Sequence, residues 1–599
     1  MSKPYTWNLN ELYSGLNDPQ IEADLQNSET IVSAFANKWR GRTDYLKDPA
    51  VLREALDELE ALNRDIGTGS RVSYYLTLSR AIDQSNTELK GFEAVVEERM
   101  TNLASKKTFF GLSLGKIDPD VQQTMLESEE LAPYRVWLKR RFEHAVHDFS
   151  EETENVLRHI LPQASSAWES MVEELLSESS ARVFTGKKKE LVPFNGLANL
   201  LSSSNLRVID EAGAGMARVM KKVAPIAERE INAIVTTNIR LNKLSKYDRV
   251  DAASFQGNDL DADVVDTILN TVKNNFAIAH EFFDLKSQLL GIETFEYHQR
   301  NLKYGDLPEG FSFEQTSDMI REMLAKLHPN FVVEFDRALA DGHIDVFPRL
   351  GKRGGAACWH QLIGHPTYLM LNHTGSLDDV QTGAHEFGHY LNNLHMQSGG
   401  LCDSLTFGAT TPMAEVASMF FEKYILDAVL KQANDEERLA ILVGYLQDEV
   451  ASIFRQSAAT LFEQELYAQV EAEGYLSYKD IGQLFNKHMS AYLGPRASMA
   501  GDAHLGWVYW GHFRAEFYNY GYVFAMLVAK ALQTRVDADP QYIDEFRRLL
   551  STGMSQTSRD LLNSMGLDVS NESVWLMGLD QLSDVLEETK QLAKKLGKI

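Results

Sequence analysis

The chain has 599 residues and a formal net charge of −26, from 59 lysines and arginines against 85 aspartates and glutamates. Hydrophobic residues make up 44% and charged residues 24%, which excludes disordered and collagen-like chains and predicts a folded protein of several domains. An acidic surface repels phosphate backbones and anionic lipids, so we expect no nucleic-acid partner and no membrane partner.

The cysteine content and the apolar segments indicate the cellular compartment of the protein. The two cysteines, Cys358 and Cys402, cannot form a disulfide framework, which favours a reducing compartment. The N-terminal segment MSKPYTWNLNELYSG has no apolar signal region, and apolar stretches such as Tyr522–Ala529 are too short to span a membrane. We therefore expect a cytoplasmic protein, and the sequence indicates no obligate protein partner.

The N-terminal third has the periodicity of helices. Residues 28–110 contain long amphipathic segments, and one of them aligns apolar side chains on a single stripe: Val51, Leu52, Ala55, Leu56, Leu59 and Leu62. Residues 150–180 predict a further helical stretch that starts at Ser150, and ARVFTGKKKELVPF predicts a hairpin that turns near Gly186. Residues 206–245 return to helix, with a break expected near Gly213–Gly215.

The middle of the chain has a different composition. Between residues 247 and 375, segments such as DAASFQGNDLD are typical of loops, and Thr367–Leu371 predicts a strand that follows a flexible Gly354-Gly355 loop. Helical periodicity resumes near residue 377 and continues to the C-terminus. The composition as a whole, with only 15 prolines, predicts a mainly α protein with a small sheet before the helix at 377.

That helix carries the most informative motif, His385-Glu386-Phe387-Gly388-His389. Ser376 and Asp379 form a capping box at its start, and Gly399-Gly400 is a helix stop. Residues four apart lie on one helical face, so His385 and His389 reach one metal ion. Glu386 is rotated by about 100° from His385, which suits a general base beside a zinc-activated water.

A second helix supplies the expected third ligand. Thr411 is a natural N-cap and Pro412 a natural first residue, which puts Glu415 in the first turn. Catalytic zinc commonly takes two histidines and one carboxylate, so we expect His385, His389 and Glu415 to bind one Zn²⁺ per chain. Glu422 lies two turns further along the same face, where it can hold a ligand imidazole by a hydrogen bond.

HEFGH followed by TPMAEVASMFFE resembles the thimet-oligopeptidase superfamily of zinc metallopeptidases, and within it the oligoendopeptidase F branch. FPRLGKRGGAACW, PTYLMLNHTGSLDDVQTGAHEFGH and WGHFRAEFYNYGYVFA agree with that branch, and the resemblance extends from about residue 110 onward. It implies a two-lobed, neurolysin-like helical zincin with a deep channel that admits short unstructured peptides. It also implies an N-terminal helical region at 1–110, an oligoendopeptidase F subdomain with a hairpin at 111–205 and a catalytic domain at 206–599.

The same resemblance assigns catalytic roles. His512 and Tyr522 match positions that donate hydrogen bonds to the oxyanion, while Tyr518, Tyr520 and His360 are left without a role. An exposed strand edge at Tyr368–Asn372 is expected to pair with the backbone of an extended peptide.

Three functions remain open at this point. The first is a zinc endopeptidase that cleaves internal bonds of short oligopeptides. The second is a relative that acts from a chain terminus, for example by removing C-terminal dipeptides. The third is a helical peptide-binding or scaffold protein that retains the motif without zinc or hydrolysis, against which the intact set His385, Glu386, His389 and Glu415 argues.

Overall fold

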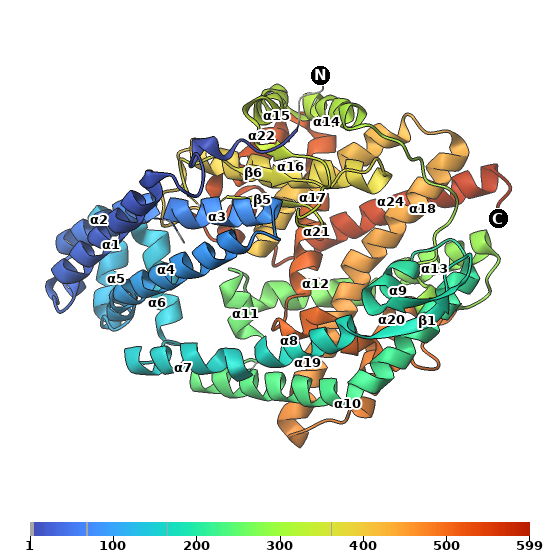
Figure 1. The fold of residues 1–599 in the computed structure, drawn as a ribbon, viewed down its shortest axis with the longest axis horizontal. Helices are drawn as coiled ribbons and strands as arrows, with labels where there is room; N and C mark the ends of the chain where they lie inside the picture. Colours follow the sequence, from blue (N-terminus) through green and yellow to red (C-terminus); the bar gives the residue numbers. More distant parts are fainter. Residues whose placement is uncertain (1–4, 67–69, 165, 361) are drawn as a thin grey trace. The chain divides into compact units, whose positions relative to one another are not determined.

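The computed structural model describes residues 5–66, 70–164, 166–360 and 362–599, so residues 1–4 of the N-terminal segment considered above lie outside it. Helices dominate these described residues, and their strands form three small sheets (Figure 1). The prediction of a mainly α protein with a small sheet before the helix at 377 is therefore confirmed. Within the described residues, no helix combines the length and apolar character that crossing a bilayer requires.

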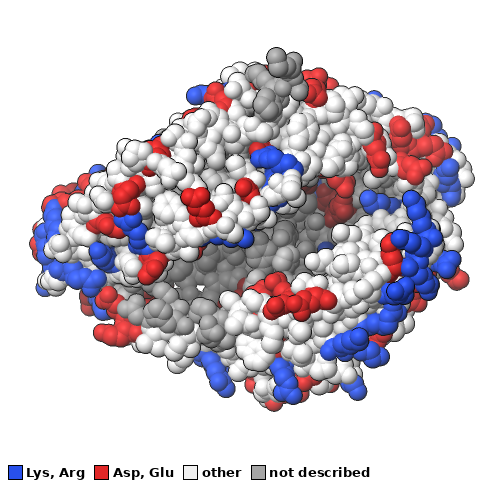
Figure 2. All heavy atoms as spheres, in the orientation of Figure 1, with Lys and Arg blue, Asp and Glu red and all other residues white. Residues whose placement is uncertain are grey.

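The chain divides into two compact units, each built from three separate segments. Unit 1 comprises residues 1–153, 309–429 and 535–565, and unit 2 comprises residues 154–308, 430–534 and 566–599. The division of the sequence into 1–110, 111–205 and 206–599 stays a prediction. On the face seen in Figure 2, acidic and basic side chains stand next to one another.

Unit 1 begins with a helical layer whose apolar stripes face each other. Leu52, Leu56 and Leu62 are buried as the periodicity predicts, and they pack with Trp39 and Phe110 in one core. The helices of this layer are α1 (Pro19–Trp39), α2 (Pro49–Ile66), α3 (Ser70–Ile82), α4 (Thr87–Leu114), α5 (Pro119–Glu127) and α6 (Arg135–Ala145). The remaining helices of unit 1 are α14 (Phe313–Leu327), α15 (Pro329–Asp341), α16 (Leu377–Ser398), α17 (Thr411–Leu430, whose last residue belongs to unit 2), α22 (Ile543–Thr552) and α23 (Ser558–Ser564).

A three-stranded sheet lies beside α16 in unit 1. Its strands are β4 (Ile344–Asp345), β5 (Ala357–Trp359) and β6 (Tyr368–Met370), in the order β4-β6-β5. β6 pairs parallel to β4 and antiparallel to β5, and all three of its residues are buried. The expectation of an exposed edge at Tyr368–Asn372 is therefore wrong, because β6 has a partner on both sides and β5 is the edge strand next to α16.

Unit 2 is organised around α10 (Leu206–Leu244), a helix of 39 residues. The predicted hairpin is present as β1 (Ser180–Phe184) and β2 (Lys189–Pro193), and β1 packs on α10. The other elements of unit 2 are α8 (Ser166–Ser177), α9 (Phe194–Leu200), α11 (Ala252–Gly257), α12 (Ala262–Asn274), α13 (Phe276–Leu290), β3 (Phe295–Glu296), α18 (Asp435–Val450), α19 (Gln456–Glu473), α20 (Tyr478–Leu493), β7 (Ala497–Ser498) and α24 (Glu572–Lys595). Like α17, α7 (Glu151–Ala164) and α21 (Tyr520–Ala538) run across the division between the units.

Two local predictions in unit 2 are wrong for the same reason. The break expected at Gly213–Gly215 does not occur, since α10 runs through both glycines. A Cβ at Gly213 would lie 2.6 Å from the ring of His298, and one at Gly215 would lie 2.8 Å from Val183, so these glycines permit close packing. Likewise, the DAASFQG segment forms α11, because tertiary packing of Phe255 overrides its loop-like composition.

Candidate active site

The start of α16 is fixed by the capping box that the sequence predicts. The Ser376 hydroxyl accepts a hydrogen bond from the Asp379 N–H at 3.1 Å, and the Asp379 carboxylate accepts one from the Ser376 N–H at 2.9 Å. The same carboxylate also accepts from the N–H groups of Thr374 and Gly375, both at 2.8 Å. Although burial acts in the opposite direction, these backbone donors lower the pKa of Asp379. The helix that carries the HExxH motif therefore begins at a well-defined position, and it ends at Ser398 before Gly399.

α16 and α17 cross in direct contact at Gly388, the fourth residue of the motif. A Cβ on Gly388 would lie 2.5 Å from the Ser418 Cα and 2.8 Å from the Ala417 carbonyl oxygen, both backbone atoms of α17. Only glycine permits this approach. α17 itself starts one residue earlier than expected, because the Thr410 carbonyl accepts the first helical hydrogen bond, from Ala414, and Thr411 is already helical. Glu415 nevertheless lies near the start of α17, as predicted.

The crossing brings together the three predicted metal ligands. Nε2 of His385 lies 3.4 Å from Oε2 of Glu415, and Nε2 of His389 lies 3.7 Å from the same oxygen. Their ligand atoms all lie within 4.8 Å of one another, and within the described residues this is the one such group of His, Cys, Asp or Glu. The Glu415 carboxylate also accepts a hydrogen bond from the Ser418 hydroxyl at 3.2 Å, which restrains its position.

A second carboxylate holds the His385 ring from its other side. Nδ1 of His385 lies 2.7 Å from Oε1 of Glu422, so Nδ1 donates there and Nε2 is directed to the other ligands. Burial alone would lower the pKa of His385, but Glu415 and Glu422 outweigh it and raise that pKa to about 10. Burial lowers the pKa of the neighbouring His389 to about 4, with His385 contributing in the same direction.

The charges around His385 indicate whether these residues can bind a metal ion. Two carboxylates and a neutral imidazole surround His385, and their negative charge is what holds a proton on it. A divalent cation among the same atoms satisfies that charge better than one proton does, and imidazole and carboxylate are common zinc ligands. The donor set therefore fits a divalent metal such as zinc.

Glu386 lies next to this group without joining it. Its side chain is 8% exposed, and burial raises its pKa to about 7 although the charge of His385 lowers it. A carboxylate with a pKa near the working pH suits proton transfer. Glu386 lines a pocket of about 340 Å³ together with the three predicted ligands, and β5 contributes Ala357 and Cys358 to the same wall. His360 also lines it, and burial lowers the pKa of that imidazole to about 4.

The second group of predicted catalytic residues lies in unit 2. The rings of His512, Tyr518 and Tyr522 form one cluster, with centroid separations of 5.1 Å, 5.6 Å and 5.5 Å. Burial lowers the pKa of His512, so the imidazole is neutral near pH 7. Nδ1 of His512 lies 3.4 Å from the Trp510 indole nitrogen and 3.3 Å from Oδ1 of Asn519, and these contacts hold the ring in place.

Tyr520 has a different environment from its neighbours. It is fully buried, and its hydroxyl donates to the Ser254 carbonyl at 3.0 Å and accepts from the Asn258 amide at 2.8 Å. Its ring packs edge-on against Phe255 at 4.8 Å. Tyr520 therefore anchors the start of α21 to α11, and its hydroxyl is occupied by these contacts.

Two buried carboxylates that sequence reasoning missed hold the segment around His512. Glu230 on α10 binds Arg514 through both oxygens, at 2.7 Å and 3.1 Å, and Arg514 also donates to the carbonyl of Trp507 at 3.0 Å and that of Trp510 at 3.1 Å. Removing one partner of such a buried pair typically costs about 3–5 kcal/mol. Glu230 and Arg514 are 284 residues apart, so no local pattern reveals the pair.

The second carboxylate, Glu463 on α19, supports a strained residue. Phe517 has φ of 53°, a left-handed conformation unusual for a bulky side chain, and its N–H donates to Oε1 of Glu463 at 2.7 Å. Burial raises the pKa of Glu463 to about 8, although its contacts with Phe517 and Asn519 act in the opposite direction. The carboxyl is thus protonated at neutral pH in the folded protein.

Glu463 predicts a pH dependence of stability. Its pKa is higher in the folded chain, about 8, than the ordinary value of 4.5, so the folded state binds more protons between these values and stability falls as pH rises through that window. The slope from one such group is at most about 1.4 kcal/mol per pH unit. In Glu463→Gln this contribution should disappear. Thermal unfolding at pH 5.5, 7 and 8 should therefore show a flatter profile for this variant than for wild type.

Glu473, an exposed carboxylate at the end of the same helix, provides the matched control. Glu473→Gln makes the same acid-to-amide change and should leave the slope between pH 5.5 and 8 unchanged. Equal slopes for wild type and Glu463→Gln would contradict the assignment of a protonated Glu463.

Two protein-family models and several curated proteins match the sequence of this chain. The model of Peptidase family M3 matches residues 216–581, and a model described as Oligopeptidase F matches residues 114–179. The Oligopeptidase PepF of Bacillus subtilis is 22% identical over 99% of this chain and 88% of its own length. Group B oligopeptidase PepB of Streptococcus agalactiae is 21% identical over 98% of this chain and 96% of its own length.

Solved structures share the fold. A putative peptidase from Chlamydophila abortus superimposes with a TM-score of 0.87 at 20% identity, covering 99% of both chains. Oligoendopeptidase-F from Enterococcus faecium gives a TM-score of 0.69 at 18% identity, covering 96% of this chain and 98% of the other. Fold and family matches together define a metallopeptidase. The chain belongs to peptidase family M3, and its resemblance to the oligoendopeptidase F branch is confirmed.

Proposed function

We propose that this peptidase is a zinc-dependent endopeptidase that hydrolyses internal bonds of short, unstructured oligopeptides. The observation that carries the proposal is the convergence of Nε2 of His385, Nε2 of His389 and Oε2 of Glu415, with Glu386 adjacent but outside the set. His385, His389 and Glu415 would hold one Zn²⁺ per chain. When bound, zinc acts as a Lewis acid that lowers the pKa of water and polarises a carbonyl.

Side chains of the protein carry out proton transfer, ligand orientation and oxyanion stabilisation. Glu386 accepts a proton from the attacking water and returns it to the leaving amine, a task suited to a buried carboxylate with a pKa near 7. Glu422 keeps the His385 ring oriented through Nδ1. The Tyr522 hydroxyl and a ring N–H of His512 donate to the oxyanion that develops on the cleaved carbonyl.

Substrate backbone is held by the edge of the small sheet. β5 has a partner on one side only, and Ala357 and Cys358 line the pocket that contains the predicted ligands. An extended peptide that pairs with this edge is bound mainly through its backbone, which favours broad side-chain specificity. The deep channel, the cytoplasmic location and the absence of nucleic-acid and obligate protein partners remain predictions from the sequence and its resemblance.

A doubly blocked peptide separates the candidate functions. An acetylated and amidated peptide of about ten residues has no free terminus, so an endopeptidase cleaves it and an enzyme that requires a free C-terminal carboxylate does not. Mass spectrometry of the products should show internal cleavage, while a native globular protein in the same tube stays intact. No cleavage of the blocked peptide, together with removal of dipeptides from its free-acid form, would favour the terminus-directed alternative. No hydrolysis of either form by zinc-loaded protein would favour the scaffold.

Tyr522→Phe tests the oxyanion donor. The substitution keeps the ring in its cluster with His512 and Tyr518 and removes only the hydroxyl. We expect kcat to fall about 10²–10³-fold with KM little changed and zinc retained, because the lost hydrogen bond forms in the transition state.

Tyr518→Phe is the matched comparison, since it makes the same chemical change in the same cluster. It should leave kcat within a few-fold of wild type. A fully active Tyr522→Phe together with an impaired Tyr518→Phe would move the donor role to Tyr518.

A further inference from the structure

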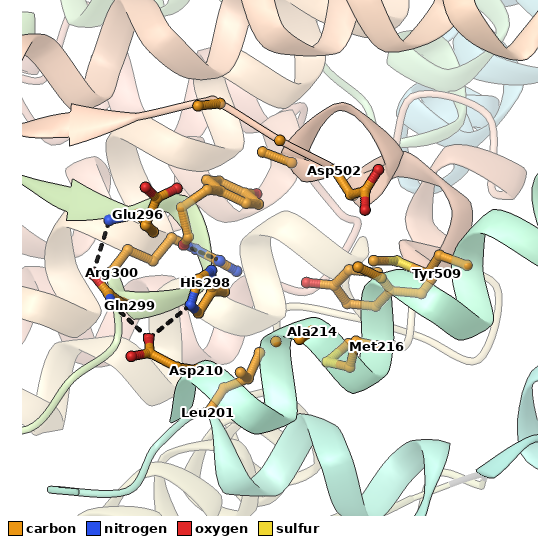
Figure 3. Close-up of a pocket in the computed structure, with 18 residues that line it drawn as sticks. Leu201, Asp210, Ala214, Met216, Glu296, His298, Gln299, Arg300, Asp502 and Tyr509 are labelled. Carbon is orange, nitrogen blue, oxygen red and sulfur yellow. Dashed lines mark hydrogen bonds and ion pairs between the residues drawn. The ribbon is translucent and has the colours of Figure 1, made fainter. Parts of the chain in front are cut away.

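Unit 2 contains a second pocket that shares no residue with the proposed catalytic set. It has a volume of about 370 Å³, within the range of small-molecule sites. Its walls come from Leu201 and α10, from residues 296–300 starting at the end of β3, and from residues 500–509, all of which lie in the same unit (Figure 3).

A buried cation without a counter-ion lines this pocket. The Arg300 side chain is 4% exposed, its Nη1 donates to the Tyr297 carbonyl at 2.8 Å, and its guanidinium lies 4.0 Å from the centre of the Tyr297 ring. Among the described residues its Nε has no acceptor, its guanidinium also interacts with the Tyr509 hydroxyl, and no aspartate or glutamate lies within ion-pair distance of it. Burying an unpaired charge is costly, so an anionic group in the pocket would complete the site.

Two further basic side chains lie behind Arg300, outside the pocket lining. The amine of Lys286, which is 1% exposed, donates to the Arg300 carbonyl at 2.6 Å and to the Gln447 amide oxygen at 2.5 Å, and burial lowers its pKa to about 7. Arg455, which also interacts with Tyr297, stacks on the Trp510 ring at 4.9 Å and has an Nε without an acceptor. The positive charge at the pocket wall therefore comes from Arg300.

Three carboxylates line the same pocket nearer to solvent. Asp210 accepts hydrogen bonds from His298 at 3.0 Å and from Gln299 at 2.6 Å, as Figure 3 shows, and its side chain is 47% exposed. Glu296 is exposed, and Asp502 is half-exposed with only the distant ammonium of Lys221 at 3.8 Å. A phosphate dianion would be repelled by these groups, whereas an ammonium would bind to them.

Much of the remaining lining is apolar. Ala214, Met216, Ala217 and Met220 present methyl and thioether groups from α10, and Leu201 adds an isobutyl group. Such a surface accepts an aliphatic side chain.

We propose that this pocket binds a short peptide with both termini free, its α-carboxylate on Arg300 and its α-ammonium on the carboxylates of Asp210, Glu296 and Asp502. Peptide hydrolysis creates one new carboxylate and one new ammonium at each cut, so the products of a peptidase belong to this chemical class. The site is separate from the catalytic pocket, and it does not depend on which residue acts as base or ligand there.

Isothermal titration with the dipeptide Ala-Leu tests the proposal. Wild type and His385→Ala should both bind one equivalent, because the pocket lies outside the predicted metal site. N-acetyl-Ala-Leu and Ala-Leu-amide should each bind at least 10-fold more weakly, since each lacks one charged terminus, and inorganic phosphate should not bind.

Two variants locate the binding. Arg300→Gln should weaken Ala-Leu at least 10-fold. Ala214→Leu keeps a good helix former at an exposed position of α10 and narrows the pocket, so it should weaken Ala-Leu similarly even where Arg300→Gln fails to fold. Arg218→Gln, at an exposed position one turn further along α10 and outside the pocket lining, should bind as wild type does. Absence of binding to wild type at millimolar peptide, unchanged affinity in Ala214→Leu, or equal binding of the blocked peptides would overturn the proposal.

Discussion

Glu386→Gln should retain its zinc and lose about 10²–10⁴-fold in kcat, the usual scale for removal of a general base. The side-chain amide has the same shape as the carboxylate, but it accepts no proton from water. Zinc content should not change, because Glu386 lies outside the group formed by His385, His389 and Glu415. The measurement is kcat and zinc per chain for the variant and wild type under the same conditions.

Asp378→Asn is the matched control, since it makes the same acid-to-amide change at an exposed position in the first turn of the same helix. It should keep both activity and metal. Loss of zinc from Glu386→Gln would make Glu386 a ligand, and full activity of that variant would place the base elsewhere.

His385→Ala and His389→Ala should each lose both zinc and activity. Either substitution removes one of two imidazole ligands and leaves Glu415 with a single histidine beside it. The fall in activity should at least equal that of Glu386→Gln, about 10²–10⁴-fold. Metal analysis after gel filtration, together with the hydrolysis rate, measures both effects.

Two further variants test whether His385 and His389 are the histidines that bind the metal. Glu422→Gln should weaken zinc binding about 10–100-fold without abolishing it, because Glu422 orients His385 and binds no metal itself. His395→Gln changes a histidine on the same helix that instead contacts Glu334 at 3.3 Å, and it should keep one zinc. One zinc and full turnover in either His385→Ala or His389→Ala would mean that the metal site lies elsewhere.

Much of the candidate site is predictable from the sequence because its determinants are local. The capping box at Ser376 and the helix stop at Gly399 fix α16, and the four-residue spacing of the two histidines fixes their common face. The distance from His385 to Glu415 leaves room for a turn and a returning helix, and the structure brings Glu415 to both rings. Gly388 is also in the motif, but its role in the helix crossing becomes visible only in three dimensions.

Other features depend on contacts between distant segments, which periodicity does not report. β6 has the composition of any short apolar strand, and only its pairing with both β4 and β5 makes it central. Gly213 looks like a helix breaker until His298 packs against it. The Glu230–Arg514 pair and the unpaired Arg300 likewise arise from tertiary packing.

Zinc titration into metal-free protein tests the central claim most directly. Hydrolysis of the doubly blocked peptide is measured after each addition of zinc to protein stripped by a chelator. The activity should be negligible without metal, rise in proportion to added zinc and reach its maximum at one equivalent per chain. Full activity in the stripped protein, or a maximum that requires two equivalents, would contradict a single catalytic zinc held by His385, His389 and Glu415.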